Sequence, residues 1–202
     1  TITIIATCIA IYKEKNLTMD LAFKYVIPII CIMFFIAMPI FRNHDEDNHW
    51  LRIYDIANGN LFVPTEYGHL FQEGATNYPA TIVPKAVFAI VDREKTAGHN
   101  LKELYQYQID KEDTTCIALP TEALYSPLQY VPQVVGVLIA KIFTNRPLIM
   151  VYAARLVNMI FSIWVLYNAI KFMPFGKKAL FIVMSIPIAV EGFTSISSDA
   201  MT

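Results

Sequence analysis

The sequence predicts an all-α fold, a polytopic membrane helical bundle with about three spanning helices, an interfacial helix and a large extracytoplasmic loop. Of the 202 residues, 55% are hydrophobic and only 16% are charged, and the mean hydropathy is +0.44. Soluble domains carry about 25% charged residues. The apolar residues also gather in long runs. These runs are nearly as long as a membrane span, which needs about 20 residues.

The composition excludes two other classes of protein. Three cysteines, Cys8, Cys31 and Cys116, are scattered along the chain and do not form the spacing of a disulfide scaffold. The net charge of −1 shows no basic excess, so nucleic acid is not an expected partner. The sequence begins without Met and ends just after an apolar run. We therefore expect a fragment of a longer protein, with the rest of the parent chain as a partner.

The charged residues are unevenly distributed along the chain. Residues 43–125 hold 13 of the 17 acidic residues, all four histidines and only six of the 16 basic residues. The remaining chain is correspondingly basic. Such a division predicts an acidic loop on one side of a membrane and short basic loops on the other side.

The first half of the chain predicts one span followed by the long loop. Residues 25–41 are the first spanning candidate, and residues 43–126 form the loop. The loop begins with a short helix that ends near Gly59. We expect residues 59–84 to be irregular and residues 85–112 to be a second amphipathic helix.

The segment 127–143 is apolar but has two interpretations. It carries one narrow polar stripe, made by Gln129, Gln133, Gly136 and Lys141. If this segment spans the membrane, Lys171, Lys177 and Lys178 fall on the same side of the membrane as the acidic loop. If it lies flat as a juxtamembrane helix, those lysines join the N-terminal ones on the cytoplasmic side, as the positive-inside rule prefers. We favour the second topology, in which 154–172 and 179–195 are the second and third spans and residues 43–153 face outside.

An acidic cluster follows the first predicted span. Asp45, Glu46 and Asp47 are consecutive, and His44 and His49 flank them. One interpretation is a solvated helix start, where acids complement the helix dipole. The other is a general base or metal-ligand site at the membrane surface. The spacing of the histidines does not match a zinc protease.

Four further positions in the second half of the chain are candidates for a functional or interfacial role. Glu191 lies inside an apolar run, and Asp199 follows it on the same face if the helix continues. Arg155 begins the second predicted span, where its guanidinium could hold a lipid phosphate or snorkel to the head groups. Tyr130 is expected to be an interfacial anchor.

The order of these features resembles the N-terminal part of GT-C membrane glycosyltransferases. More specifically, it resembles a bacterial family of predicted polytopic membrane proteins of unknown function within that superfamily. The residues that carry the resemblance run from the first loop to the end of the third span, and they are Asp45, Glu46, His49, Arg52, Gly59, residues 126–130, Arg155 and Asp199. Asp47 stands where the family often has proline. The resemblance covers residues 25–202.

The resemblance implies an enzyme of the bacterial plasma membrane that uses a polyprenyl-phosphate-linked sugar, with this donor and membrane lipids as partners. Asp45 would be the general base on the acceptor hydroxyl, and Glu46 or Asp199 would hold a divalent cation or a basic side chain against the leaving phosphate. Metal use varies within the superfamily, so the cofactor stays open. The substrate-binding residues expected from the resemblance and the features above are His49, Arg52, Arg155, Tyr130 and Glu191.

Two alternatives to catalysis stay open. The chain could be a non-catalytic subunit that transports or flips lipid-linked sugars, which would not need Asp45 as a base. It could also be a membrane scaffold or sensor whose acidic loop binds a cation or a partner, in which case residues 60–112 would matter more than Asp45.

Overall fold

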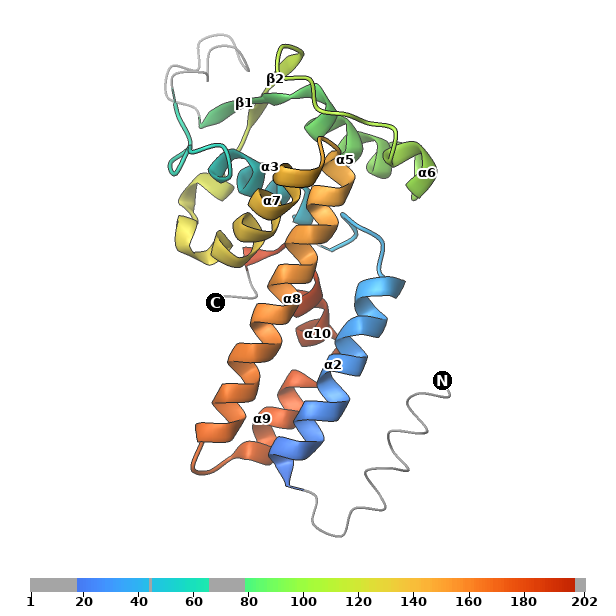
Figure 1. The fold of residues 1–202 in the computed structure, drawn as a ribbon. Helices are drawn as coiled ribbons and strands as arrows, with labels where there is room; N and C mark the ends of the chain where they lie inside the picture. The colour runs from blue at the N-terminus through green and yellow to red at the C-terminus, as the bar shows by residue number, and fades with distance from the viewer. Residues whose placement is uncertain (1–17, 44, 66–78, 199–202) are drawn as a thin grey trace.

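The structure is a computed structural model, and it describes residues 18–43, 45–65 and 79–198. It has two regions stacked end to end (Figure 1). The first is an apolar bundle, whose helices are α2 (Met19–Ala37), α8 (Pro147–Phe172), α9 (Lys177–Met184) and α10 (Pro187–Thr194). The second lies at one end of the bundle and comprises the elements between residues 45 and 143, which we call the polar cap. The long helix α8 begins in the cap and continues into the bundle (Figure 1).

Two helices of the bundle are long and apolar enough to cross a membrane, over Asp20–Ala37 and Pro147–Phe172. The first begins earlier than predicted because Thr18 caps it, accepting a hydrogen bond from the Leu21 N–H at 3.4 Å. The second begins at Pro147 and not at residue 154, since proline suits the first turn of a helix. With 26 residues α8 is roughly 39 Å long, which exceeds the about 30 Å of a hydrocarbon core.

The prediction of one continuous helix over 179–195 is wrong. The structure divides this segment into α9 and α10, which are separated by Ser185 and Ile186. Pro187 is the reason, because proline has no N–H for the helix and forces the residue before it into an extended conformation. Ile186 accordingly has ψ of 135°. Neither of the two eight-residue helices reaches the length of a span alone.

The prediction of an all-α chain is wrong in the cap, which contains a two-stranded antiparallel sheet. Strand β1 (Ala80–Pro84) pairs with β2 (Thr114–Ala118), with Ile82 opposite Cys116. Both strands are five residues long and rich in β-branched residues, which favour extended structure. Such short runs are easily missed in a sequence, and β1 occupies the end of the segment that we expected to be irregular.

The helices of the cap lie on one side of this sheet, between it and the top of α8 (Figure 1). They are α3 (Glu46–Ile56), α5 (Lys85–Ala97), α6 (Leu101–Leu104), η1 (Glu122–Leu124), η2 (Pro127–Tyr130) and α7 (Val131–Phe143). The short helix predicted after the first span is confirmed as α3, and Gly59 follows it with φ of +101°. The predicted amphipathic helix 85–112 is shorter and divides into α5 and α6.

Helix α7 lies very close to α8. A Cβ atom added to Gly136 would lie 2.5 Å from the carbonyl oxygen of Ala153 and 2.8 Å from Cα of Ala154. Glycine is therefore required for the two backbones to approach this closely. At 13 residues α7 is shorter than the about 20 residues of a spanning helix, and its orientation to a membrane stays a prediction.

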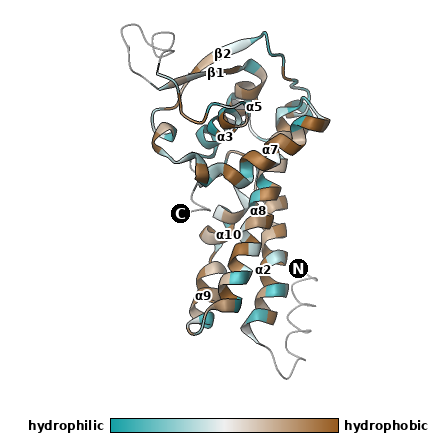
Figure 2. Ribbon diagram, turned by 60° about the vertical axis from the view of Figure 1, so that its left-hand side comes forward, coloured by the Kyte–Doolittle hydropathy of each residue, from teal (hydrophilic) through white to brown (hydrophobic). Residues whose placement is uncertain are grey.

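The two regions have separate hydrophobic cores. The bundle core is built from α2, α8, α9 and α10, and its buried members are Phe23, Ile27, Cys31, Met159, Ile170, Met184 and Val190. The cap core centres on Trp50 and Ile53 of α3, packed against residues of α5, α7 and the start of α8. The hydropathy colouring shows the bundle helices as mostly hydrophobic along their length, whereas the cap mixes polar and apolar residues (Figure 2). Several large apolar side chains of the bundle, such as Ile36 and Ile188, are exposed. This distribution is the one expected for a bundle surrounded by lipid and a cap in water.

Candidate functional site

The candidate site lies at the junction between the bundle and the cap, where α3 begins. Asp45 precedes α3, is exposed, and has a left-handed backbone with φ of +56°. Its carbonyl oxygen accepts the His49 N–H at 3.0 Å. Only a few residue types adopt this conformation readily, among them aspartate and asparagine. The chain therefore enters α3 through a sharp turn that presents the Asp45 side chain at the junction.

Glu46 is buried directly behind Asp45. Its Oε1 atom accepts the backbone N–H of Ile196 at 3.1 Å, and it lies 3.9 Å from Nε of Arg155. Burial raises the pKa of this carboxyl, while the charge of Arg155 and nearby backbone N–H groups oppose that shift. Glu46 thus lies beside a basic side chain inside the protein, and its bond to Ile196 ties α3 to the segment after α10. Its predicted role toward a leaving phosphate stays a prediction.

Arg155 is also committed to contacts within the protein. It is 1% exposed, and it donates from Nε to the Thr194 carbonyl at 2.8 Å and from Nη1 to the Met38 carbonyl at 3.1 Å. Its guanidinium also lies 5.4 Å from the ring centre of Phe35. The phosphate-binding role stays a prediction, and these contacts favour a positioning role instead, since one side chain joins α2, α8 and α10.

The chain after α10 is held by several other side chains. Residues 194–198 are buried, and side chains from the cap and from α8 bind their backbone or side-chain atoms. Asn158 donates to the Ser195 carbonyl at 2.9 Å, Gln133 donates to the Ser197 carbonyl at 3.2 Å, and Asn43 donates to Ser195 Oγ at 3.2 Å. We call residues 194–198 the clamped segment.

The sequence predicted that Glu191 and Asp199 lie on one helix face if the helix continues, and the structure shows that the helix does not continue. Helix α10 ends at Thr194, and Ser195 is extended with ψ of 179°. Glu191 and Asp199 therefore do not share one continuous helix face. Glu191 lies on α10 and is partly buried, whereas Asp199 lies outside the described residues.

His49 and Tyr130 form a buried pair between α3 and the start of α7. The His49 Nδ1 atom and the Tyr130 hydroxyl are 2.8 Å apart, and Tyr130 is fully buried. Burial raises the pKa of Tyr130, and a hydrogen bond with Ser198 lowers it by less. Tyr130 is therefore an interior residue next to the clamped segment, and the prediction of an interfacial anchor is wrong.

Arg52 is fixed in the interior of the cap. It forms an ion pair with Asp55 at 2.9 Å and donates to the carbonyl groups of Asn60 at 2.9 Å and of Leu61. Asp55 also accepts the Thr81 hydroxyl at 2.7 Å. This network connects α3, the turn after Gly59 and strand β1. Substrate binding by Arg52 stays a prediction, and its contacts point to a structural role.

Glu122 is a buried acid that the sequence analysis missed. It is 2% exposed, and burial raises its pKa. The negative charges of Asp45 and Asp47 raise it further, whereas a hydrogen bond from the Asn48 side chain lowers it. Glu122 therefore belongs to the same electrostatic site as Asp45. Nothing in its local sequence marks it, because only the folding of the cap brings η1 to the beginning of α3.

The residues described by the structure do not form a metal site. No group of three or more His, Cys, Asp or Glu side chains among them is arranged to hold an ion. Glu46, one of the two expected ligands, is already occupied by Arg155 and Ile196. We therefore derive no chemical step through a metal.

Comparison with known proteins returns one family. A family model described as "Predicted membrane protein (DUF2142)" matches residues 29–202, which is most of the chain. No curated protein and no solved structure matches the chain.

Proposed function

The chain belongs to the DUF2142 family of predicted membrane proteins, and on that premise we propose that it carries the first catalytic loop of a membrane glycosyltransferase. The donor is a sugar on a polyprenyl phosphate, and transfer takes place on the extracytoplasmic side of a bacterial plasma membrane. The products are cell-surface glycans. This proposal rests on the GT-C resemblance of the sequence and on the geometry of the junction.

One observation carries most weight, namely the hydrogen bond from the Ile196 N–H to Glu46 at 3.1 Å. It joins the start of α3 to the clamped segment, although 150 residues separate the two in sequence. Asp45, which resembles a catalytic acid of the superfamily, directly precedes α3; the second such acid, Asp199, follows the clamped segment in the sequence and lies outside the described residues. An exposed acid at a boundary between apolar and polar regions suits a reaction between a lipid-linked donor and a water-soluble acceptor.

In the proposed reaction Asp45 removes the proton from the acceptor hydroxyl. The hydroxyl oxygen then forms a bond to the anomeric carbon, and the bond from that carbon to the phosphate oxygen breaks. The electron pair leaves with the polyprenyl phosphate, and the configuration at the sugar carbon is inverted. Asp45 suits the role of base because it is exposed and its backbone is held in place by the turn into α3.

The buried groups around Asp45 act as positioning residues in this proposal. Glu46 and Arg155 hold α3 against the clamped segment, and the bond between His49 and Tyr130 holds α3 against η2 at the start of α7. The leaving phosphate needs a cation that it can reach, and Arg42 meets this requirement better than Arg155. Arg42 is 49% exposed and lies three residues before Asp45, although it also contacts Glu94 at 3.4 Å.

The test is Asp45→Asn in the full-length parent protein, expressed in cells that lack the wild-type copy. Asparagine adopts the left-handed conformation as readily as aspartate, so the turn into α3 is expected to survive. We expect normal amounts of protein in the membrane, accumulation of the donor lipid and loss of one sugar from the surface glycan. Asp113→Asn is the matched control, because Asp113 is exposed and pairs only with the exposed Lys85 in the described contacts. Unchanged donor and glycan levels in the Asp45 variant would exclude Asp45 as the base.

A second candidate function is a subunit that flips lipid-linked sugars, and the break between α9 and α10 favours it. Interrupted helices are a common feature of membrane transport proteins. This function requires the break but not the Asp45 carboxylate. Full glycan assembly by the Asp45→Asn variant, together with loss of assembly when Pro187 is replaced by Ala, would favour transport over transfer.

A further inference from the structure

A pocket lies at the C-terminal end of α3, whereas Asp45 lies at its N-terminal end. Its volume is about 340 Å³, which falls within the range of small-molecule sites. The lining residues come from the end of α3 and the turn after it, from the chain before β2, and from α7, α8 and the turn between them. They are Tyr54, Asn58, Ile109, Lys111, Lys141, Thr144, Asn145 and Met150. The 11 residues of α3 lie between Asp45 and Asn58, or roughly 16 Å at the helical rise, so this pocket is distinct from the junction.

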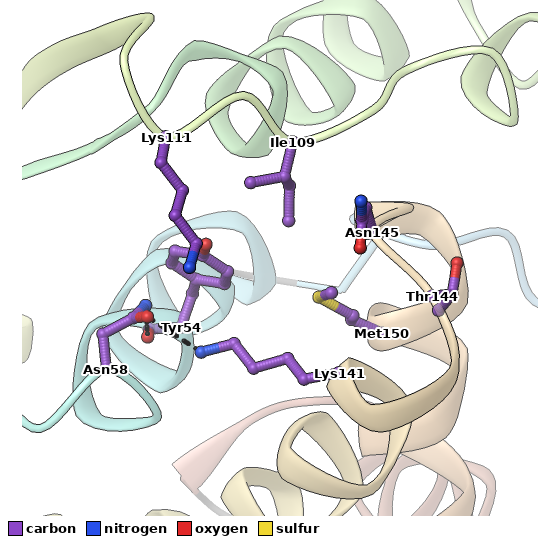
Figure 3. Close-up of a pocket in the computed structure, with 8 residues that line it drawn as sticks. All are labelled: Tyr54, Asn58, Ile109, Lys111, Lys141, Thr144, Asn145 and Met150. Carbon is purple, nitrogen blue, oxygen red and sulfur yellow. Dashed lines mark hydrogen bonds between the residues drawn. The ribbon is translucent and has the colours of Figure 1, made fainter.

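Two lysines meet in this pocket. Lys111 and Lys141 extend toward the pocket from opposite sides (Figure 3), and the ammonium group of Lys141 ends over the ring of Tyr54. Lys141 Nζ lies 4.9 Å from the centre of that ring and donates to the Ala57 carbonyl at 3.0 Å and to Asn58 Oδ1 at 2.8 Å. Burial, and then the positive charge of Lys111, lower the pKa of Lys141.

No carboxylate compensates this pair of charges within the described part of the chain. Neither lysine forms an ion pair there, and no acidic residue lines this pocket. Asp110, Glu112 and Asp113 flank Lys111 in the sequence but do not line the pocket; Asp110 accepts the Glu112 N–H at 3.0 Å, and Asp113 pairs with Lys85 at 2.6 Å. Two like charges that share a pocket destabilise each other, and a bound anion would relieve that repulsion.

A backbone hydrogen bond holds the walls of the pocket together, and the walls carry apolar, aromatic and polar groups. The Ile109 N–H donates to the Asn145 carbonyl at 2.9 Å, which fastens the chain before β2 to the turn between α7 and α8. Ile109 and Met150 provide apolar surface, and the Tyr54 ring provides a flat face. Asn58, Thr144 and Asn145 provide amide and hydroxyl groups around the rim (Figure 3).

These observations together define the ligand class. Two ammonium groups suit an oxyanion, the aromatic and aliphatic surface suits the C–H face of a sugar ring, and the amides suit its hydroxyl groups. We propose that this pocket binds an anionic monosaccharide, one that carries a phosphate or a carboxylate, as a free molecule or as the end of a glycan. An adjoining pocket of about 280 Å³ shares Tyr54, Asn58 and Lys111 and leaves room for a second sugar unit; its lining also includes Asp55, which pairs with Arg52.

The test is calorimetric titration of the detergent-solubilised chain with four probes: glucose 1-phosphate, glucuronate, inorganic phosphate and uncharged glucose. We expect glucose 1-phosphate or glucuronate to bind and glucose not to bind. Binding of glucose 1-phosphate alone identifies a sugar phosphate, and binding of glucuronate alone identifies a uronic acid. If inorganic phosphate binds as tightly as the anionic sugars, the sugar assignment is wrong.

Lys111→Gln is the informative variant. Lys111 makes no hydrogen bond or ion pair with the described residues, so its loss leaves the fold intact, whereas Lys141 anchors the end of α3. We expect the dissociation constant of the bound sugar to rise about tenfold, as for loss of one charged hydrogen bond. Lys102→Gln is the matched control, because Lys102 is exposed on α6 and does not line the pocket. Absence of binding by either anionic sugar, or equal affinity in the Lys111 variant, would overturn the proposal.

Discussion

The bundle and the polar cap differ in what they bury. The bundle core is almost entirely apolar, and large side chains such as Ile36 and Ile188 are exposed on its outside, each to 77%. The cap instead buries charged groups, among them Arg52, Asp55 and Glu122. The bundle therefore depends on lipid to cover its surface, while the cap depends on satisfied hydrogen bonds in its interior. At the junction Glu46 of the cap meets Arg155 of the bundle. This contact couples the folding of the cap to the packing of the bundle helices.

Arg155→Met is expected to have the largest effect on stability. It removes two hydrogen bonds that join the bundle helices and leaves Glu46 buried without its cation. Loss of one partner from a buried ion pair costs about 3–5 kcal/mol. Thermal unfolding in detergent measures this effect. Lys85→Met is the control, since it breaks an exposed ion pair and is expected to change stability by no more than about 0.5 kcal/mol.

Gly136→Ala tests the contact between the cap and α8 without changing any charge. The added methyl group would overlap the backbone of Ala153 and Ala154, so α7 must move away from α8. Such overpacking costs about 1–3 kcal/mol. Gly192→Ala in α10 is the control, because a Cβ atom there meets nothing within 4 Å and alanine favours the helix. Equal stability of the two variants would contradict the close packing of α7 on α8.

Thr81→Val tests the polar interior of the cap with a smaller change. The Thr81 hydroxyl donates to Asp55 at 2.7 Å, and both residues are buried. Valine has nearly the same shape, so the expected loss of about 1 kcal/mol measures the hydrogen bond alone. Thr114→Val on the exposed end of β2 is the control. If chemical denaturation gives the same free energy of unfolding for both variants, the Asp55 network does not contribute to stability.

The smallest expected effect is a pH dependence that arises from Glu122. Its pKa in the folded protein is raised, chiefly by burial, so protonation favours the folded state. This contribution to stability is fully present below the pKa of the unfolded chain and is lost as the pH rises through the folded pKa. Glu122→Gln is therefore expected to match the wild type near pH 4 and to be more stable than the wild type near pH 8. Melting temperatures of the two proteins across this range measure the difference, and parallel curves would contradict it.

The sequence predicted the local structure of the chain better than its long-range contacts. Apolar runs, the acidic start of α3 and the turn at Gly59 all depend on neighbouring residues, and each is present in the structure. The break at Pro187 also had a local signal, but the apolar character of the run concealed it. The pairing of β1 with β2 depends on segments about 30 residues apart, and no local pattern marks such pairing.

The candidate site was only partly predictable for the same reason. Asp45, Glu46 and Arg155 stood out because charge beside an apolar run is unusual. Their contacts were not predictable, since an arginine that binds a phosphate and one that joins three helices look alike in a sequence. Glu122 had no signal at all, because its importance comes from the position of η1 beside Asp45.

The most direct test of the central claim is the rate of sugar release from a radiolabelled polyprenyl-phosphate sugar by the purified full-length protein. The account predicts that Asp45→Asn lowers this rate by about 10²–10⁴-fold, the usual contribution of a general base, while donor binding and melting temperature are unchanged. Wild-type rates in the Asp45 variant would contradict transfer at the junction of the bundle and the cap.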